Sequence, residues 1–126
     1  MSEITRDFLH DGRDDESLAA MALSDTEKAM IDVVRTIYDP EIPVPIWDLG
    51  LIYGWTLTDG DGGLHADVSM TLTAPNCPAA ESLPREVEEG MTALDGVAQA
   101  SVEITFVPSY SMEMLSDEAR LTLGFM

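Results

Sequence analysis

The chain has 126 residues, which suffices for one domain with a hydrophobic core and is short for two. Its 24 acidic residues outnumber its 6 basic ones, and a net charge of -18 repels nucleic-acid phosphates and anionic lipids. We therefore expect no nucleic-acid partner and no membrane partner. No apolar run is long enough to span a membrane, and the N-terminus lacks a signal-peptide pattern. The single cysteine permits no internal disulfide, so we expect a cytoplasmic protein.

Residues 1–23 are polar and acidic, and their apolar residues show no sustained period. Such a composition is typical of a mobile, solvated extension, with at most a short helical turn near residues 18–23. A role in recruiting a partner is the less favoured interpretation of this segment. We therefore place an acidic extension at 1–23 and the ordered domain at 24–126.

The first predicted helix begins at Ser24, which can cap it, and Glu27 completes a capping box three residues later. An apolar stripe at helical spacing follows, formed by Met30, Val33, Val34 and Ile37. The helix is expected to end at Asp39, because Pro40 disfavours helical angles in the residue before it. Prolines at 40, 43 and 45 then predict an extended, rigid connector.

The next segments predict a hairpin followed by a helix and a third strand. Apolar residues alternate over 51–57 and 64–72, and the intervening "DGDGG" at 59–63 is typical of a hairpin loop. A helix is expected over 78–94, with a kink or a break at Pro84, and alternation resumes over 98–106. Ser116 can cap a last short helix. The order α-β-β-α-β-α predicts an α+β two-layer domain, with a small three-stranded mixed sheet covered by helices.

Cys77 lies in "LTAPNCPAAESLP", just before the helix that is predicted over 78–94. Unpaired backbone N–H groups at a helix start favour negative charge and lower a thiol pKa. No basic residue stands close in sequence, however, and Glu81 would oppose ionisation. A small buried residue at a helix start fits the position equally well. Position alone leaves both interpretations open.

Three carboxylates, Asp39, Glu41 and Asp48, lie on the proline-rich connector. Carboxylates on a stiffened loop can bind a metal or orient a thiol, because less entropy is lost on ordering them. In so acidic a chain, ordinary surface carboxylates are the favoured interpretation of these residues alone. His65 is the one histidine in 24–126, so a thiol enzyme built on Cys77 would need it as the general base.

Three motifs in order resemble those of SufT-like proteins. They are "DPEIPVPIWDLGLIYGW" at 39–55, "MTLTAPNCPAAESLPREVEE" at 70–89 and "LSDEARLTLG" at 115–124. SufT-like proteins belong to an iron–sulfur assembly family that also contains PaaD-type proteins and the eukaryotic cytosolic iron–sulfur targeting factor. The resemblance covers about 24–125. It is closer to SufT than to PaaD-type members, which typically carry an additional cysteine-rich C-terminal segment.

The resemblance implies an accessory role in iron–sulfur cluster assembly or transfer, with iron–sulfur assembly proteins and client apoproteins as partners. It implies that Cys77 is the functional thiol. The motif positions that it carries onto this chain are Asp39, Pro40, Glu41, Asp48, Leu49, Gly50, Tyr53, Thr71, Thr73 and Pro75. The family often has a tryptophan-bearing segment after the last strand, and this chain has "FVPSYSMEM" there, so partner contacts of that segment do not carry over.

One cysteine limits the chemistry, since an iron–sulfur cluster generally needs about four protein ligands, mostly thiolates. We therefore expect no cofactor bound tightly by the monomer. Three arrangements remain: Cys77 residues paired in a homodimer, a transient ligand for iron or a cluster shared with a client or carrier, or no metal contact. We favour the transient ligand. The alternative functions are a cysteine-independent interaction module that binds a basic partner, and a thiol enzyme with Cys77 as nucleophile.

Overall fold

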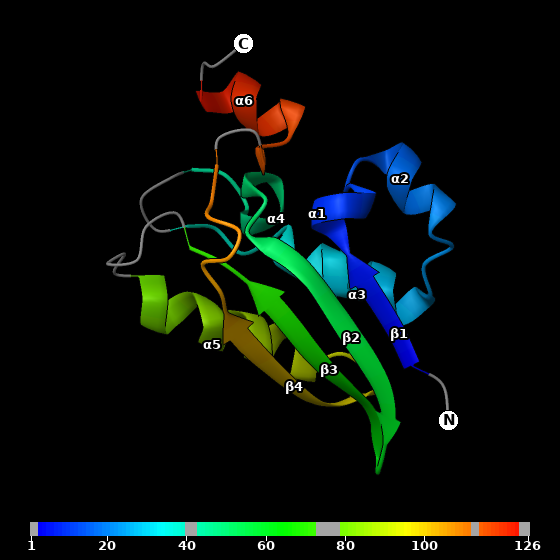
Figure 1. Ribbon diagram of the computed structural model, residues 1–126. Helices are drawn as coiled ribbons and strands as arrows, with labels where there is room; N and C mark the ends of the chain where they lie inside the picture. Colours follow the sequence, from blue (N-terminus) through cyan, green and yellow to red (C-terminus); the bar gives the residue numbers. More distant parts are fainter. Residues whose placement is uncertain (1–2, 40–42, 73–78, 112–113, 124–126) are drawn as a thin grey trace.

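The computed structural model describes residues 3–39, 43–72, 79–111 and 114–123 (Figure 1). Within these ranges the strands are β1 Glu3–Asp7, β2 Ile52–Gly60, β3 Gly63–Met70 and β4 Val97–Ile104, hydrogen-bonded in the order β1-β2-β3-β4. The helices are α1 Phe8–Asp11, α2 Asp15–Ala20, α3 Asp25–Val34, α4 Ile46–Leu49, α5 Ala79–Thr92 and α6 Asp117–Leu123. The predicted α+β class is confirmed, with four strands in the described sheet instead of three.

The sheet is mixed, as the sequence predicts. β2 and β3 form an antiparallel hairpin, and β4 pairs parallel to β3. Parallel neighbours need a crossover connection, which α5 supplies. α5 runs from Ala79 to Thr92 as one helix that includes Pro84, so the proline does not divide it into two helices.

The additional strand is β1, in the segment that we expected to be a mobile extension. β1 pairs antiparallel with β2, with Glu3 opposite Thr58 and Asp7 opposite Gly54. The expectation of no strand in this segment was wrong. Alternation does not reveal β1 because one of its inward positions holds Arg6, whose guanidinium bonds to Glu27, instead of an apolar residue. The domain boundary at residue 24 stays a prediction.

The core lies between the sheet and the layer of α3 and α5, which Figure 1 shows behind the strands. The predicted capping box at the start of α3 is present, since Ser24 Oγ accepts from the Glu27 N–H at 3.2 Å and Glu27 Oε1 accepts from the Ser24 N–H at 3.2 Å. The buried apolar side chains include Met30, Ile31, Val34, Trp47, Leu51, Trp55, Leu57, Val68, Met70, Leu72, Leu83, Val87 and Met91. In the described ranges, no helix is both long and apolar enough to cross a membrane.

The proline-rich connector, which we expected to be extended throughout, ends in the one-turn helix α4. Pro45 caps α4, and the Ile46 N–H donates to the Ile37 carbonyl at 2.8 Å. Gly50 ends the helix in the left-handed conformation, with φ of 82°. Four residues are too few to show a helical period, so the sequence pattern does not predict α4.

Candidate functional site

Three segments that carry the motifs meet at one end of the sheet. α4 presents Asp48 and Leu49 just before β2 begins, and Tyr53 lies near the start of β2. Thr71 directly follows β3, and its N–H donates to the Leu51 carbonyl at 2.8 Å. Tyr53 and Thr71 are both buried. The antiparallel hairpin thus places motif residues from two strands side by side.

The segment after β4 covers this end of the sheet. The Tyr110 hydroxyl donates to the Leu49 carbonyl at 2.6 Å, and the Ser116 N–H donates to the Asp48 carbonyl at 2.8 Å. In the opposite direction, the Tyr53 hydroxyl of β2 donates to the Pro108 carbonyl of the covering segment at 2.8 Å. Tyr110 of the altered "FVPSYSMEM" segment and Ser116 beyond it are therefore held against the Asp48–Leu49 motif, by a side-chain and a backbone hydrogen bond respectively.

The hydroxyls of Tyr53 and Tyr110 at this end of the sheet are hydrogen-bond donors that are largely shielded from water. Burial raises the pKa of Tyr110 to about 12, and the positive charge of Arg13 opposes the rise. Burial likewise raises the pKa of Tyr53, where Thr71 and Arg13 oppose it. Both tyrosines thus remain protonated at neutral pH and keep their hydrogen bonds. Asp39 is 5% exposed, and its charge also acts on Tyr110.

The predicted site residues fall into two groups. The structure brings together Asp39, Asp48, Leu49, Gly50, Tyr53 and Thr71. The remaining predicted positions, Pro40, Glu41, Thr73, Pro75 and Cys77, lie outside the described residues. The role of each position stays a prediction.

Metal ligands and a general base would be further candidates for chemistry at this end of the sheet. The described part of the chain contains no group of three or more His, Asp and Glu side chains arranged to hold a metal ion. His65 lies beside Thr58 and Gly60 at the hairpin end of β3, whereas Thr71 lies at the opposite end of the same strand. His65 is therefore remote from the described motif residues.

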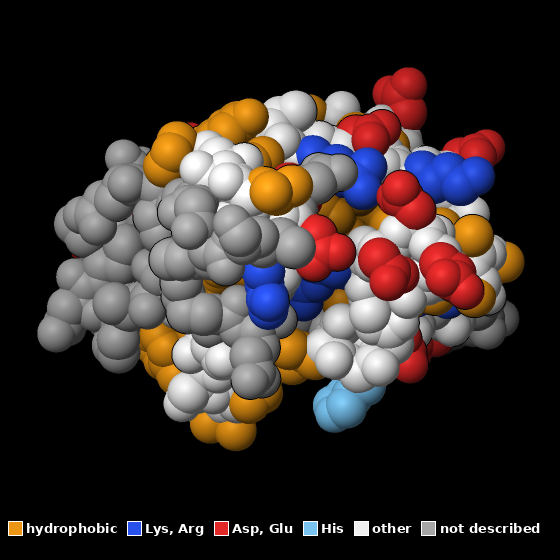
Figure 2. All heavy atoms as spheres, turned by 90° about the horizontal axis from the view of Figure 1, so that it is seen from above, with side chains coloured by type: hydrophobic (Ala, Val, Ile, Leu, Met, Phe, Trp, Pro, Cys, Tyr) orange, Lys and Arg blue, Asp and Glu red, His pale blue; other side chains and the backbone are white. Residues whose placement is uncertain are grey.

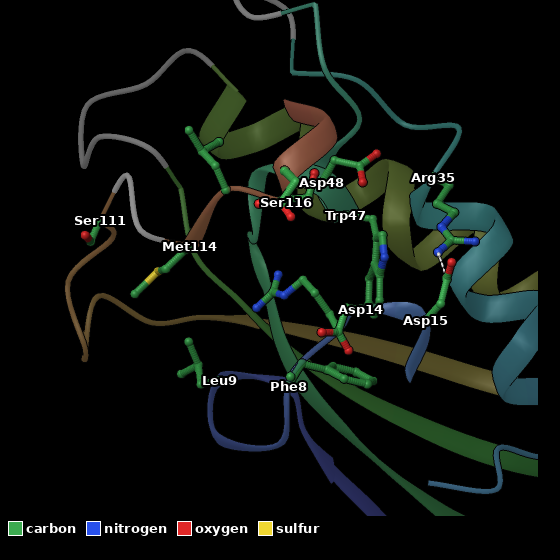
Figure 3. A pocket seen from close by; sticks show the side chains of 14 residues that line it. Phe8, Leu9, Asp14, Asp15, Arg35, Trp47, Asp48, Ser111, Met114 and Ser116 are labelled. Atoms are coloured by element: carbon green, nitrogen blue, oxygen red, sulfur yellow. Dashed lines mark ion pairs between the residues drawn. The ribbon is translucent and has the colours of Figure 1, made fainter. Parts of the chain in front are cut away.

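A cleft of about 530 Å³ opens beside α4 (Figure 3). Phe8 and Leu9 line it from the N-terminal segment, Trp47 and Asp48 from α4, and Met114 from the segment before α6. Phe8 is buried, with its ring edge-on to Trp47 at a centroid distance of 5.0 Å. The N-terminal segment thus forms one wall of a cleft next to the motif.

Sequence reasoning missed the contributions of Arg13 and Tyr110 to this end of the molecule. Arg13 is one of two arginines in the acidic segment 1–23, which shows no period, and nothing in the sequence links it to the motif. Tyr110 carried a signal, because it is an aromatic residue at the position where the family often has tryptophan. Its hydrogen bond to Leu49 depends on a contact across 61 residues, which no local pattern reveals.

Comparison with known proteins identifies the family. Residues 27–104 match the family model described as "Iron-sulfur cluster assembly protein". An Fe-S protein maturation auxiliary factor of Porphyromonas gingivalis is 45% identical over 101 residues, which cover 80% of this chain and 93% of that protein. The auxiliary factor SufT of Staphylococcus aureus is 30% identical over 88 residues, covering 70% of this chain and 97% of SufT.

A solved structure agrees with the assignment. The Bacillus anthracis protein described as a domain of unknown function, DUF59, matches with a TM-score of 0.71 and 28% identity, covering 85% of this chain and 99% of that chain. The family match includes α4, both strands of the hairpin and the segment that contains Cys77. The chain therefore belongs to the family of iron–sulfur cluster assembly proteins.

Proposed function

We propose that the protein is a non-enzymatic accessory factor that helps to assemble iron–sulfur clusters or to transfer them to client proteins. The observation that carries this proposal is the family match over 27–104, which contains both the acidic-proline motif and the cysteine motif. Relatives of the chain are known as Fe-S protein maturation auxiliary factors and an iron–sulfur cluster carrier protein. Assembly proteins and client apoproteins are the partners that this function requires, and the cytoplasm is its setting.

Cys77 is the group that we assign to contact the cargo. One thiolate is far from the roughly four ligands that a cluster needs, so the monomer holds no cluster by itself. A ligand that supplies one bond can be displaced when a client offers its own thiolates, which suits transfer. Iron or a cluster is thus a transient cargo in this proposal, shared between Cys77 and a carrier or client.

The motif residues are assigned to shape the surface around that cargo. Asp48 and Leu49 are fixed through their backbone carbonyls by Ser116 and Tyr110. The hydrogen bonds use backbone atoms of α4, so they leave the Asp48 carboxylate available for a partner. A rigid acidic loop end beside Thr71, a described residue of the cysteine motif, supports recognition of an assembly partner.

The experiment introduces Cys77→Ser into the gene in cells that make this protein. It then measures the activity of a client enzyme with a four-iron cluster while the demand for iron–sulfur clusters is high. We expect client activity to fall while the abundance of the Cys77→Ser protein stays unchanged. Ser101→Ala, an exposed change on β4, serves as the matched control and should leave client activity at the wild-type level. Full maturation by Cys77→Ser at normal abundance would refute the role of the thiol.

The same variants distinguish two alternatives. An interaction module with an acidic surface predicts partner binding that weakens strongly with added salt and survives Cys77→Ser. A thiol enzyme predicts that His65→Gln abolishes activity as fully as Cys77→Ser. The position of His65 at the hairpin end of β3 favours the accessory role, for which His65→Gln leaves client maturation intact.

A further inference from the structure

The cleft beside α4 is lined by a half-buried cation, Arg13, that forms no ion pair among the described residues. Arg13 lines the cleft, and its Nη1 is buried with no hydrogen-bond partner among the described residues. Burial lowers the pKa of this guanidinium. An arginine remains charged in a protein, and removing its charge from water is unfavourable unless an anion replaces the lost hydration.

Four described carboxylates, Asp14, Asp15, Asp48 and Asp117, line the cleft, and none of them forms an ion pair with Arg13. Asp14 caps α2 by accepting from the Ser17 N–H at 2.7 Å, and Asp15 pairs with Arg35 at 4.0 Å. Asp48 attracts Arg13 electrostatically but forms no ion pair with it in the described part of the chain. Arg13 lines the cleft and has no ion pair among the described residues, so its guanidinium can pair with an oxygen anion placed there.

A second arginine contacts the same tryptophan as Arg13. The guanidinium carbons of Arg13 and Arg35 lie 5.7 Å and 6.0 Å from the ring centroid of Trp47, so both cations lie over its indole. Two of the six basic residues of this strongly acidic chain thus meet at one tryptophan. Figure 2 shows blue side chains reaching the surface of this end of the molecule among the red carboxylates.

The rest of the cleft is suited to an apolar group. Leu9 and Met114 are half-buried and line the cleft, together with the buried Phe8 and with Ser116 (Figure 3). The cleft therefore combines an arginine fork with an apolar wall within about 530 Å³. A guanidinium binds a carboxylate through two parallel hydrogen bonds, which gives direction as well as attraction.

We propose that this cleft binds a carboxylate carried on an apolar body, with the carboxylate paired to Arg13 and the body against Leu9 and Met114. The carboxylate belongs either to a small organic acid or to an acidic side chain within a partner protein. Arg13 lies outside the residues that match the family, so this site is a feature of the N-terminal segment and does not depend on Cys77. Its failure would leave the proposed function untouched.

The first test uses the unaltered protein and compares hexanoate with hexanamide, which has the same apolar body and no charge. Binding is followed by the shifts of the Trp47 indole N–H and the Arg13 side-chain N–H signals in NMR spectra. We expect hexanoate to bind at least tenfold more tightly than hexanamide. Equal binding of the two, or no shift of either signal with hexanoate, would overturn the proposal.

The second test assigns the effect to Arg13. Arg13→Gln should weaken hexanoate binding at least tenfold, whereas Arg85→Gln, which removes an exposed charge on α5 outside the cleft, should leave it unchanged. Equal losses in the two variants would show a general charge effect and refute the site. The acid–amide comparison needs no variant, so it remains decisive even if Arg13→Gln fails to fold.

A third arm distinguishes the two sources of the carboxylate. The blocked tripeptide acetyl-Leu-Glu-Leu-amide is compared with its Gln counterpart and with hexanoate. Tighter binding of the Glu peptide than of hexanoate supports a partner protein, and the reverse supports a small organic acid. A Gln peptide that binds as well as the Glu peptide would contradict recognition of a carboxylate.

Discussion

Gly50 combines an unusual backbone conformation with a close approach of two segments. Its φ is 82°, and a Cβ there would lie 2.4 Å from the Met114 carbonyl oxygen. Gly62 in the hairpin turn also has φ of 82°, but a Cβ there would meet only the Ala98 Cβ at 3.8 Å, an ordinary contact. The two glycines therefore separate backbone strain from steric exclusion.

We expect Gly50→Ala to destabilise the protein by more than Gly62→Ala. The left-handed conformation costs about 1–2 kcal/mol for a non-glycine residue at either position. Gly50→Ala adds overpacking against the backbone of Met114, typically about 1–3 kcal/mol more. Urea unfolding of both variants measures the difference. Equal losses of stability would show that Met114 moves away from the added Cβ at no cost in free energy.

Glu27 is a buried carboxylate with an unusually complete set of donors. It is fully buried and accepts from Arg6 Nε at 2.7 Å, Arg6 Nη2 at 2.9 Å and Trp55 Nε1 at 3.1 Å. Burial alone would raise the pKa of Glu27, but the hydrogen bonds from Arg6, Trp55 and Ser24 outweigh it and lower the pKa below the ordinary 4.5. The ionised form is therefore the one that the fold stabilises.

This shift predicts a pH-dependent effect of Glu27→Gln. Because the folded-state pKa is lowered, the carboxylate stabilises the fold at pH values above about 4.5, and this contribution is lost as the pH falls through the folded-state pKa. We expect Glu27→Gln to cost about 2–4 kcal/mol at pH 7 and progressively less as the pH falls below 4.5. Guanidinium-chloride unfolding at several pH values checks this. Glu86→Gln, on the exposed face of α5, is the control, and a pH-independent penalty for Glu27→Gln would contradict the argument.

Local and distant contacts of Glu27 differ in how far sequence predicts them. The capping box with Ser24 was predictable, because it depends on residues three apart at a helix start. The bond from Arg6 joins residues 21 apart, and the bond from Trp55 joins residues 28 apart. No pattern in the sequence pairs these side chains, so the capping glutamate gave no sign of being a buried ion-pair partner.

At the scale of elements, β4 is an edge strand that α5 protects. Glu88 of α5 accepts a hydrogen bond from the Val102 N–H at 3.1 Å with its Oε1. Unpaired N–H groups on edge strands can recruit further strands, and a side-chain acceptor on such a group blocks that pairing. α5 therefore does more than connect β3 to β4.

We expect Glu88→Ala to make the Val102 amide exchange its hydrogen faster, by up to about tenfold, because a hydrogen bond of this kind contributes about 0.5–1.5 kcal/mol. Native-state hydrogen exchange followed by NMR measures this. Glu89→Ala, on the exposed neighbouring position of α5, should leave the Val102 amide unchanged. Unaltered exchange in Glu88→Ala would show that another group protects this edge.

The elements that sequence predicted are those with enough residues to display a period or a turn signal. α3, the β2–β3 hairpin and α6 with its Ser116 cap were expected and are present. β1 and α4 were not expected, because each has five residues or fewer and relies on contacts with distant segments. The convergence of Tyr53 with Thr71 followed from the hairpin, whereas the presence of Arg13 beside them did not.

At the scale of the whole molecule, the described N-terminal segment packs closely against the rest of the fold. β1 covers the edge of β2, and Phe8 packs between Trp47 and Trp55, at 5.0 Å and 4.8 Å between ring centroids. Figure 1 shows β1 as the outermost strand, beside β2. Removing the segment would expose the β2 edge and two tryptophans, and it would leave Glu27 without Arg6.

Deleting residues 1–23 therefore tests two consequences together. We expect the shortened chain to unfold at a lower urea concentration than the full chain, because burying Phe8 alone contributes about 3–5 kcal/mol. We also expect Glu27→Gln to be far less costly in the shortened chain than in the full one, or even stabilising, because the carboxylate there is buried without its cation. The four proteins form a double-mutant cycle, and the coupling between the deletion and Glu27→Gln should reach about 1–3 kcal/mol. Additive losses would show that Arg6 is dispensable to Glu27 and that the N-terminal segment is attached by its apolar contacts alone.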